Sequence, residues 1–184
     1  MDLKFRDLKA DEIELRVGIC KENGLSLLLY KNARVDMDIL DETVGAMSWK
    51  RSHTRDNANC IVSIWDSDKK EWVTKEDTGT ESNTEAEKGL ASDSFKRACV
   101  NWGIGRELYT APFIWVNKDK CNIYQQGNKY GCRDKFKVAG IKIENKRITG
   151  LMIYNQDKLN DKGQMVVVYK LVPPKKEEKG ANNE

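Results

Sequence analysis

The stretch from Gly79 to Tyr109 constrains the fold more than any other part of the chain, because it has the pattern of one long helix with a marked start and stop. Apolar residues recur within it at steps of four, three and four, at Ala91, Phe95, Ala98 and Trp102. Residues at this spacing share one face of a helix, so we expect that face to be buried.

Both ends of this helix carry local signals. Thr84 followed by Glu87 fits a capping box, in which each side chain satisfies a free amide of the first turn. Gly103 can adopt the left-handed conformation that follows a last helical turn, and Gly105 keeps the chain bent away. We therefore predict that the helix ends near Trp102.

Lys96 and Arg97 stand side by side on this helix, about 100° apart in projection and off the apolar stripe. They can therefore face a partner together. A solvated cationic pair is the simpler interpretation, because the helix dipole favours positive side chains near a C-terminus. Local sequence alone favours that simpler interpretation.

Three strands are expected before the helix, at Trp49–Thr54, Asn59–Trp65 and Glu71–Asp77. The middle segment alternates along its length and is largely apolar on both faces. Asp66–Lys70 has the composition of a hairpin loop. An antiparallel meander packed on the long helix is the natural assembly.

Two short helices are expected nearer the N-terminus. Asp11–Val17 places Ile13 and Val17 one turn apart, and Ala33–Val44 places its apolar residues on one face. The acidic residues of the second helix are expected to form a solvated face rather than a metal site; they are Asp36, Asp38, Asp41 and Glu42. Leu25–Tyr30 fits either a strand or a buried turn.

Beyond Pro112 the sequence becomes more β-like. Strands are expected at Phe113–Val116, Val138–Glu144, Arg147–Asn155 and Met165–Leu171, the middle two forming a hairpin around Asn145 and Lys146. The segment between the first two is expected to be a basic loop holding Lys118, Lys120, Tyr124, Lys129, Tyr130, Arg133, Lys135 and Lys137. Interleaved cations and rings suit single-stranded nucleic acid, and a mobile solvated loop explains them equally.

Length and composition bound the remaining possibilities. The 184 residues favour one domain over 1–172, with a core at about 12–112, a β-rich segment at 113–172 and a disordered polar tail at 173–184. The net charge is only +3, so a nucleic-acid site must be a local concentration of Lys and Arg. Without a membrane-length apolar run or a signal sequence, a soluble cytoplasmic protein is expected.

Several chemistries have no signature in the chain. Five widely spaced cysteines without a CxxC motif suggest neither disulfides nor a zinc site, and His53 is the single histidine. There is no GxxxxGK[ST] phosphate loop, which disfavours an ATP-driven recombinase. The carboxylates show no recognisable nuclease spacing. We therefore expect no catalytic residue, metal or cofactor.

Two stretches carry a resemblance: YKNARVDMDILDETVGAMSWKR at 30–51 and TGTESNTEAEKGLASDSFKRACVNWGIGRELY at 78–109. They resemble the Rad52 superfamily of single-strand annealing proteins, and most closely its phage members of the Sak type. The similarity runs from about Glu12 to Pro112. Its most specific pieces are Ala-Arg before a short helix, Val-Gly-x-x-x-Trp after it, and Ser-Asp-x-Phe-Lys-Arg-Ala followed by Trp-Gly-Ile-Gly-Arg.

The resemblance implies an antiparallel β-β-β-α core. Together with the N-terminal short helices and the additional C-terminal β-hairpin region expected from the residues, this predicts an α+β fold. It implies ATP-independent binding and annealing of single-stranded DNA in recombination and repair, by a homo-oligomeric ring or arc without enzymatic activity. A single-strand-binding protein or an exonuclease would be the protein partner, in the bacterial host cytoplasm if the chain is phage-encoded.

In the family, an arginine at the place of Arg34 reaches the backbone of the bound strand, and the resemblance gives that role to Arg34. The full set expected to contact DNA is Arg34, Arg51, Lys75, Lys96, Arg97 and Arg106. Val100 stands where some relatives carry a further arginine. We expect Arg106 to compensate, so that Arg106→Ala weakens strand binding without unfolding the protein.

Two alternatives stay open. A metal-dependent nuclease of the same pathway would shorten labelled DNA when magnesium is added. A recombination adaptor would bind a partner protein through the tail or the 118–137 segment. Such an adaptor would lose function, but not DNA binding, when the tail is deleted.

Overall fold

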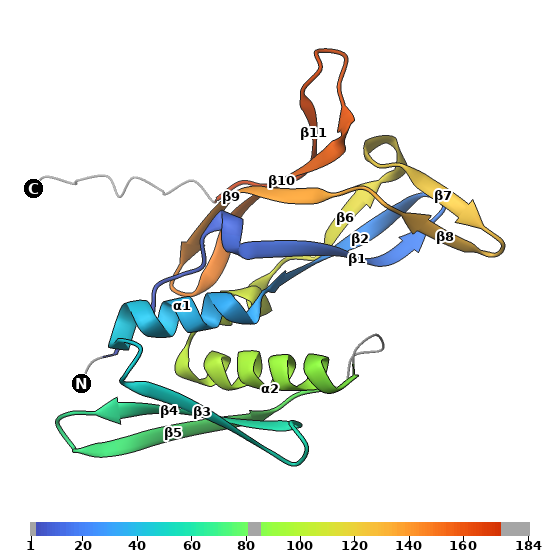
Figure 1. Ribbon diagram of the computed structural model, residues 1–184. Helices are drawn as coiled ribbons and strands as arrows, with labels where there is room; N and C mark the ends of the chain where they lie inside the picture. Colours follow the sequence, from blue (N-terminus) through green and yellow to red (C-terminus); the bar gives the residue numbers. More distant parts are fainter. Residues whose placement is uncertain (1–2, 81–85, 174–184) are drawn as a thin grey trace, which may run out of the picture. The chain divides into compact units, whose positions relative to one another are not determined.

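The structure is a computed structural model that describes residues 3–80 and 86–173. It confirms the α+β class, with mostly antiparallel sheets and two α-helices in the described part of the chain (Figure 1). The chain forms two compact units: residues 1–14 with 29–111, and residues 15–28 with 112–184. No helix in the described ranges is long and apolar enough to cross a membrane.

The first unit is built on a three-stranded antiparallel sheet in the order β3 (Trp49–Thr54), β4 (Asn59–Asp66) and β5 (Glu71–Thr78). Helix α2 (Ala86–Trp102) packs on this sheet (Figure 1). The core between them is formed by alternate residues of the central strand and one face of the helix: Cys60, Val62, Ile64, Phe95 and Ala98. The apolar residues that alternate along the strand and those on one face of the helix thus pack together in one layer.

Helix α2 ends as its glycine signal predicts. The Ile104 amide donates to the Cys99 carbonyl and the Gly103 amide to the Val100 carbonyl, which is the hydrogen-bond pattern of a Schellman motif. Gly103 has φ +100, so its left-handed conformation is confirmed. The proposed capping box at Thr84 lies outside the described residues.

Helix α1 (Ala33–Val44) has the predicted bounds, with the Asn32 side chain accepting a hydrogen bond at its start. The prediction of a fully solvated acidic face is wrong for Asp36, which is completely buried. Burial is tolerated because Lys31 forms an ion pair with it.

The short helix expected at 11–17 is also wrong. A three-residue 3-10 turn at Ala10–Glu12 leads into strand β1 (Ile13–Lys21), which pairs with β2 (Gly24–Lys31). The apolar residues at 13, 15 and 17 fit a period of two as well as one helical turn. Pairing with the apolar β2 across a two-residue turn decides in favour of the strand.

The N-terminal arm of the first unit is held by charged contacts. Arg6 donates to both oxygens of Glu12 at 2.7–2.8 Å and also pairs with Glu42 of α1. The hydrogen bonds that Arg6 donates to these two glutamates raise its pKa. The Leu8 amide donates to Glu107, in the 3-10 helix η2 (Arg106–Thr110), at 2.7 Å.

The second unit contains two whole sheets and most of a third. Residues of the β1–β2 hairpin join β6 (Ile114–Asn117), with Leu25 opposite Val116. Strands β9 (Phe136–Glu144), β10 (Arg147–Leu159) and β11 (Met165–Leu171) form an antiparallel sheet in the order β11-β10-β9. Asn145 and Lys146 both have positive φ, as a tight two-residue hairpin requires.

The prediction of a basic loop at 118–137 is wrong, because part of this segment forms the third sheet. Lys118–Lys120 is a short 3-10 helix (η3), and a hairpin of β7 (Ile123–Gln126) and β8 (Lys129–Cys132) follows. The high charge of the segment concealed two short strands around the turn at Gly127, whose φ is +58. The prediction of a disordered tail falls almost wholly on residues 174–184, outside the described part.

Candidate nucleic-acid interface

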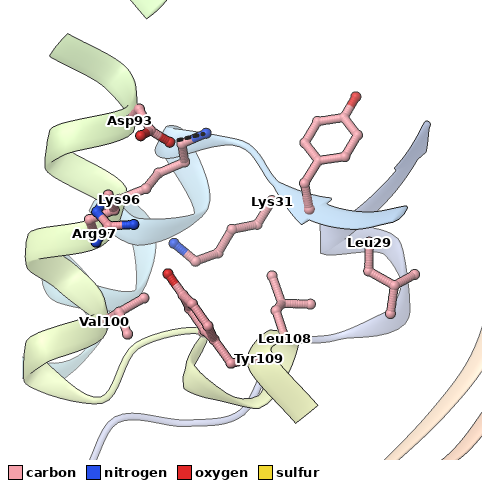
Figure 2. Close-up of a pocket in the computed structure, with 10 residues that line it drawn as sticks. Leu29, Lys31, Asp93, Lys96, Arg97, Val100, Leu108 and Tyr109 are labelled. Carbon is pink, nitrogen blue, oxygen red and sulfur yellow. Dashed lines mark ion pairs between the residues drawn. The ribbon is translucent and has the colours of Figure 1, made fainter. Parts of the chain in front are cut away.

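A cavity of about 230 Å³ opens in the first unit, beside the predicted cation pair. Its walls come from the end of β2, one side of α2 and the segment after α2 (Figure 2). It is lined by Leu29, Tyr30, Lys31, Asp93, Lys96, Arg97, Val100, Gly105, Leu108 and Tyr109. We call it the β2–α2 cavity.

Helix α2 contributes Asp93, Lys96, Arg97 and Val100, which lie on one side because they are three, four and seven residues apart. The Lys96 ammonium is 4.0 Å from the Asp93 carboxylate. The Arg97 Nε is 3.3 Å from a carboxylate oxygen of Asp77 on β5. Both pairs are partly exposed and neither is short, so each contributes little stability and can exchange partners.

Lys31 is the cation that sequence reasoning missed. Its side chain is only 4% exposed and its ammonium pairs with Asp36, at the start of α1. Burial raises the pKa of Asp36 to about 6, and the charge of Lys31 opposes that rise. The ion pair between this carboxylate and the Lys31 ammonium holds the lysine in place.

Gly105 is the residue that makes room for Lys31. A Cβ at this position would lie 2.2 Å from the Lys31 Cε, and Gly105 has φ +66. Glycine is thus needed both for the backbone conformation and for the close passage of the lysine chain. This explains one glycine of the Gly-Ile-Gly-Arg segment in physical terms.

Helix η2 forms the far wall of the cavity. Leu108 is half-buried, whereas Tyr109 is 67% exposed. Figure 2 shows the Lys31 ammonium and the Tyr109 hydroxyl pointing toward α2, on the side that carries Val100. Polar groups from three elements therefore meet at an apolar-walled opening.

Arg34, the residue given a DNA-binding role by resemblance, is exposed on the first turn of α1. Its backbone amide donates to the Asn32 side chain at 3.0 Å. Arg34 lies outside the cavity lining as the described residues define it. The structure therefore brings Lys96 and Arg97 together with Lys31, and leaves Arg34 separate.

Arg51 and Lys75 occupy matching places on the two outer strands, since both pair with Val62 of β4. The Arg51 guanidinium lies 4.6 Å from the centre of the Phe95 ring. The Lys75 ammonium lies 4.7 Å from the Trp102 ring and donates to the Asn101 carbonyl at 2.8 Å. Both cations therefore pack against α2.

Arg106 is exposed but engaged. Its guanidinium donates to the carbonyls of Val100 and Asn101 at 3.0–3.3 Å, at the C-terminal end of α2. A positive charge there also favours the helix dipole. Its predicted contact with DNA stays a prediction.

The basic hairpin of the second unit separates its two tyrosines. Tyr124 is opposite Gly131 and Tyr130 is opposite Gln125, so the two rings lie on opposite faces of the hairpin. The Arg133 guanidinium lies 5.1 Å from the exposed Tyr124 ring, and Lys129 shares that face. One face alone thus combines a ring with cations; Lys118 and Lys120 lie in η3.

One sequence signal could have pointed to Lys31 as a buried cation. The apolar run Leu27–Tyr30 ends directly before this lysine. A cation at the end of a buried strand needs a counter-ion, but nothing in the spacing identifies Asp36 as that partner. In the described ranges, no group of three or more His, Cys, Asp or Glu side chains is arranged to hold a metal ion.

Residues 6–127 match the model of the Rad52/22 family of double-strand break repair proteins. The matched range is more than half of the chain and contains the whole β2–α2 cavity. No curated protein and no solved structure matches the chain.

Proposed function

The chain belongs to the Rad52/22 family of double-strand break repair proteins, and on that premise we propose that it binds single-stranded DNA and anneals complementary strands without ATP. The observation that carries the proposal is the pair Lys96 and Arg97 at an open, cation-lined cavity. Their partners are partly exposed carboxylates, which a phosphate can replace.

Backbone binding explains how such a surface promotes annealing. Cations that neutralise phosphates release counter-ions and reduce the repulsion between two approaching strands. A strand held by its phosphates keeps its base edges free for pairing. The search for complementarity is then carried out by the DNA, and no nucleotide hydrolysis is needed.

We extend the proposal to an oligomer. Protomers arranged side by side in a ring or arc would align Arg34, Lys96 and Arg97 of each copy along one continuous groove. The face of the β7–β8 hairpin that carries Tyr124, Lys129 and Arg133 is a second place where a strand can stack and pair its phosphates.

The test is annealing of two complementary labelled oligonucleotides in buffer that contains EDTA and no nucleotide, with electron microscopy of the same sample. We expect annealing faster than the spontaneous rate, and rings or arcs in the images. A rate equal to the spontaneous one would contradict the proposal. Shortening of the DNA after addition of magnesium would instead support the nuclease alternative.

A further inference from the structure

Lys31 has more hydrogen-bonding capacity than its surroundings use. A lysine ammonium carries three N–H donors and no acceptor. Residues 3–80 and 86–173 offer it one acceptor, the Oδ1 atom of Asp36. Because Lys31 lines the β2–α2 cavity, its other donors are available to a group that enters there.

The charges around the cavity favour an anion of compact shape. Lys31, Lys96 and Arg97 line it, and each pairs with a carboxylate, but only that of Asp93 is part of the lining; Asp36 and Asp77 lie outside it. Asp36 is completely buried and holds Lys31 by its ammonium. Leu29, Val100 and Leu108 form apolar parts of the wall, which strengthen charge interactions by lowering the local dielectric constant.

We propose that the β2–α2 cavity is a phosphate subsite, in which Lys31 acts with Lys96 and Arg97 to hold one phosphodiester group of a bound strand. This inference rests on the proposed function and adds Lys31 as a direct ligand. The Tyr109 hydroxyl is the fourth donor, at the mouth of the cavity. Lys31, from β2, thereby supplies a cation to the cavity that Val100 of α2 also lines.

A competing explanation is that Lys31 and Asp36 only fasten the end of β2 to α1. The two explanations differ in what happens when the pair is removed without changing the net charge. Lys31→Met/Asp36→Leu replaces it by apolar residues, a change that is often neutral or stabilising for a buried pair. Lys31→Gln/Asp36→Asn replaces it by two neutral groups that can still hydrogen-bond to each other.

The binding experiment titrates labelled oligo-dT at several salt concentrations between about 50 and 200 mM. For both double variants we expect affinity roughly tenfold lower. The slope of log K against log salt should flatten by about 0.7, one phosphate contact. The matched control is Lys69→Gln/Glu71→Gln, which removes an exposed ion pair of 4.0 Å outside the cavity lining, again without changing net charge.

Wild-type affinity and slope in a folded double variant would overturn the phosphate subsite, and so would an equal loss in the control. If Lys96→Ala/Arg97→Ala still loses binding in that case, the proposed function stands alone. Failure of the wild type to bind oligo-dT would overturn both proposals. Should both double variants unfold, the side-chain ¹⁵N resonance of wild-type Lys31 must shift when oligo-dT is added, and an unchanged resonance contradicts the subsite.

Discussion

Two groups of cations lie along α2, and they differ in their partners. Lys96 and Arg97, which line the β2–α2 cavity, pair with carboxylates, Lys96 with Asp93 on α2 and Arg97 with Asp77 on β5. On the side of the sheet, Arg51 and Lys75 lie over the rings of Phe95 and Trp102. We call the second two the sheet-side cations.

We propose that this difference determines which cations bind a strand, so that Arg51 and Lys75, which were expected from the sequence to contact DNA, do not bind it. A carboxylate and a phosphate satisfy a lysine or arginine in the same way, so the cavity cations can exchange one for the other. A sheet-side cation covers an aromatic ring at the edge of the helix–sheet core, and moving it would uncover that ring. The positions of Lys and Arg along the sequence do not reveal this distinction.

The largest effect is expected from Gly105→Ala, which disturbs the cavity itself. The new methyl group meets the Lys31 side chain at a position with φ +66, so unfolding stability should fall by about 2–4 kcal/mol. Gly103→Ala is the matched control, because φ is +100 there but nothing lies within 4 Å of the added Cβ. It should lose only about 1–2 kcal/mol, measured by urea denaturation; equal losses would contradict the role of Lys31 at Gly105.

Removing the sheet-side cations tests whether they bind DNA as well. Arg51→Ala and Lys75→Ala should each lower stability by about 0.5–1 kcal/mol, the range for an exposed cation–π contact. Their affinity for oligo-dT and its salt slope should remain those of the wild type in the folded protein. A slope flattened by about 0.7 in either variant would give that residue a phosphate contact.

The smallest effect is expected from Asp77→Asn. This substitution removes the ion-pair partner of Arg97 and tests whether Asp77 competes with a strand for this arginine. The Asn side chain keeps the size of the aspartate but removes its charge, which lies 3.3 Å from the Arg97 Nε. Strand binding should become about two- to fivefold tighter, measured by fluorescence anisotropy. Weaker binding would show that Asp77 positions Arg97 for the strand rather than competing with it.

Much of the fold could be predicted from local sequence patterns. The helix at 33–44 and the end of α2 followed from apolar spacing and from glycines that can adopt positive φ. The prediction of a helix at 11–17 was wrong because its apolar residues fit both a helical period and a strand period. Only pairing with β2 selects the strand. The prediction of a loop over 118–137 missed the hairpin at 123–132, because the high charge of the segment obscured its two short strands.

The site was less predictable from the sequence than the fold. Lys96 and Arg97 were identified through a family resemblance, since a cation pair near a helix end is common. Lys31 and Asp36 carry no such signal, because their pairing depends on the burial of both at a strand–helix junction. Likewise, the rings beneath Arg51 and Lys75 become their partners only when the sheet packs on α2.

The most direct test of the account is the salt dependence of oligo-dT binding by Lys96→Ala/Arg97→Ala, beside the control Arg51→Ala/Lys75→Ala. Melting temperature and oligomeric size are recorded for each, because a failed assembly would also weaken binding. The account predicts that the first variant binds all sequences more weakly, with a slope flatter by roughly 0.7 for each phosphate that is no longer neutralised, and that the control keeps the wild-type slope. A folded, correctly assembled Lys96→Ala/Arg97→Ala protein with the wild-type slope would contradict it.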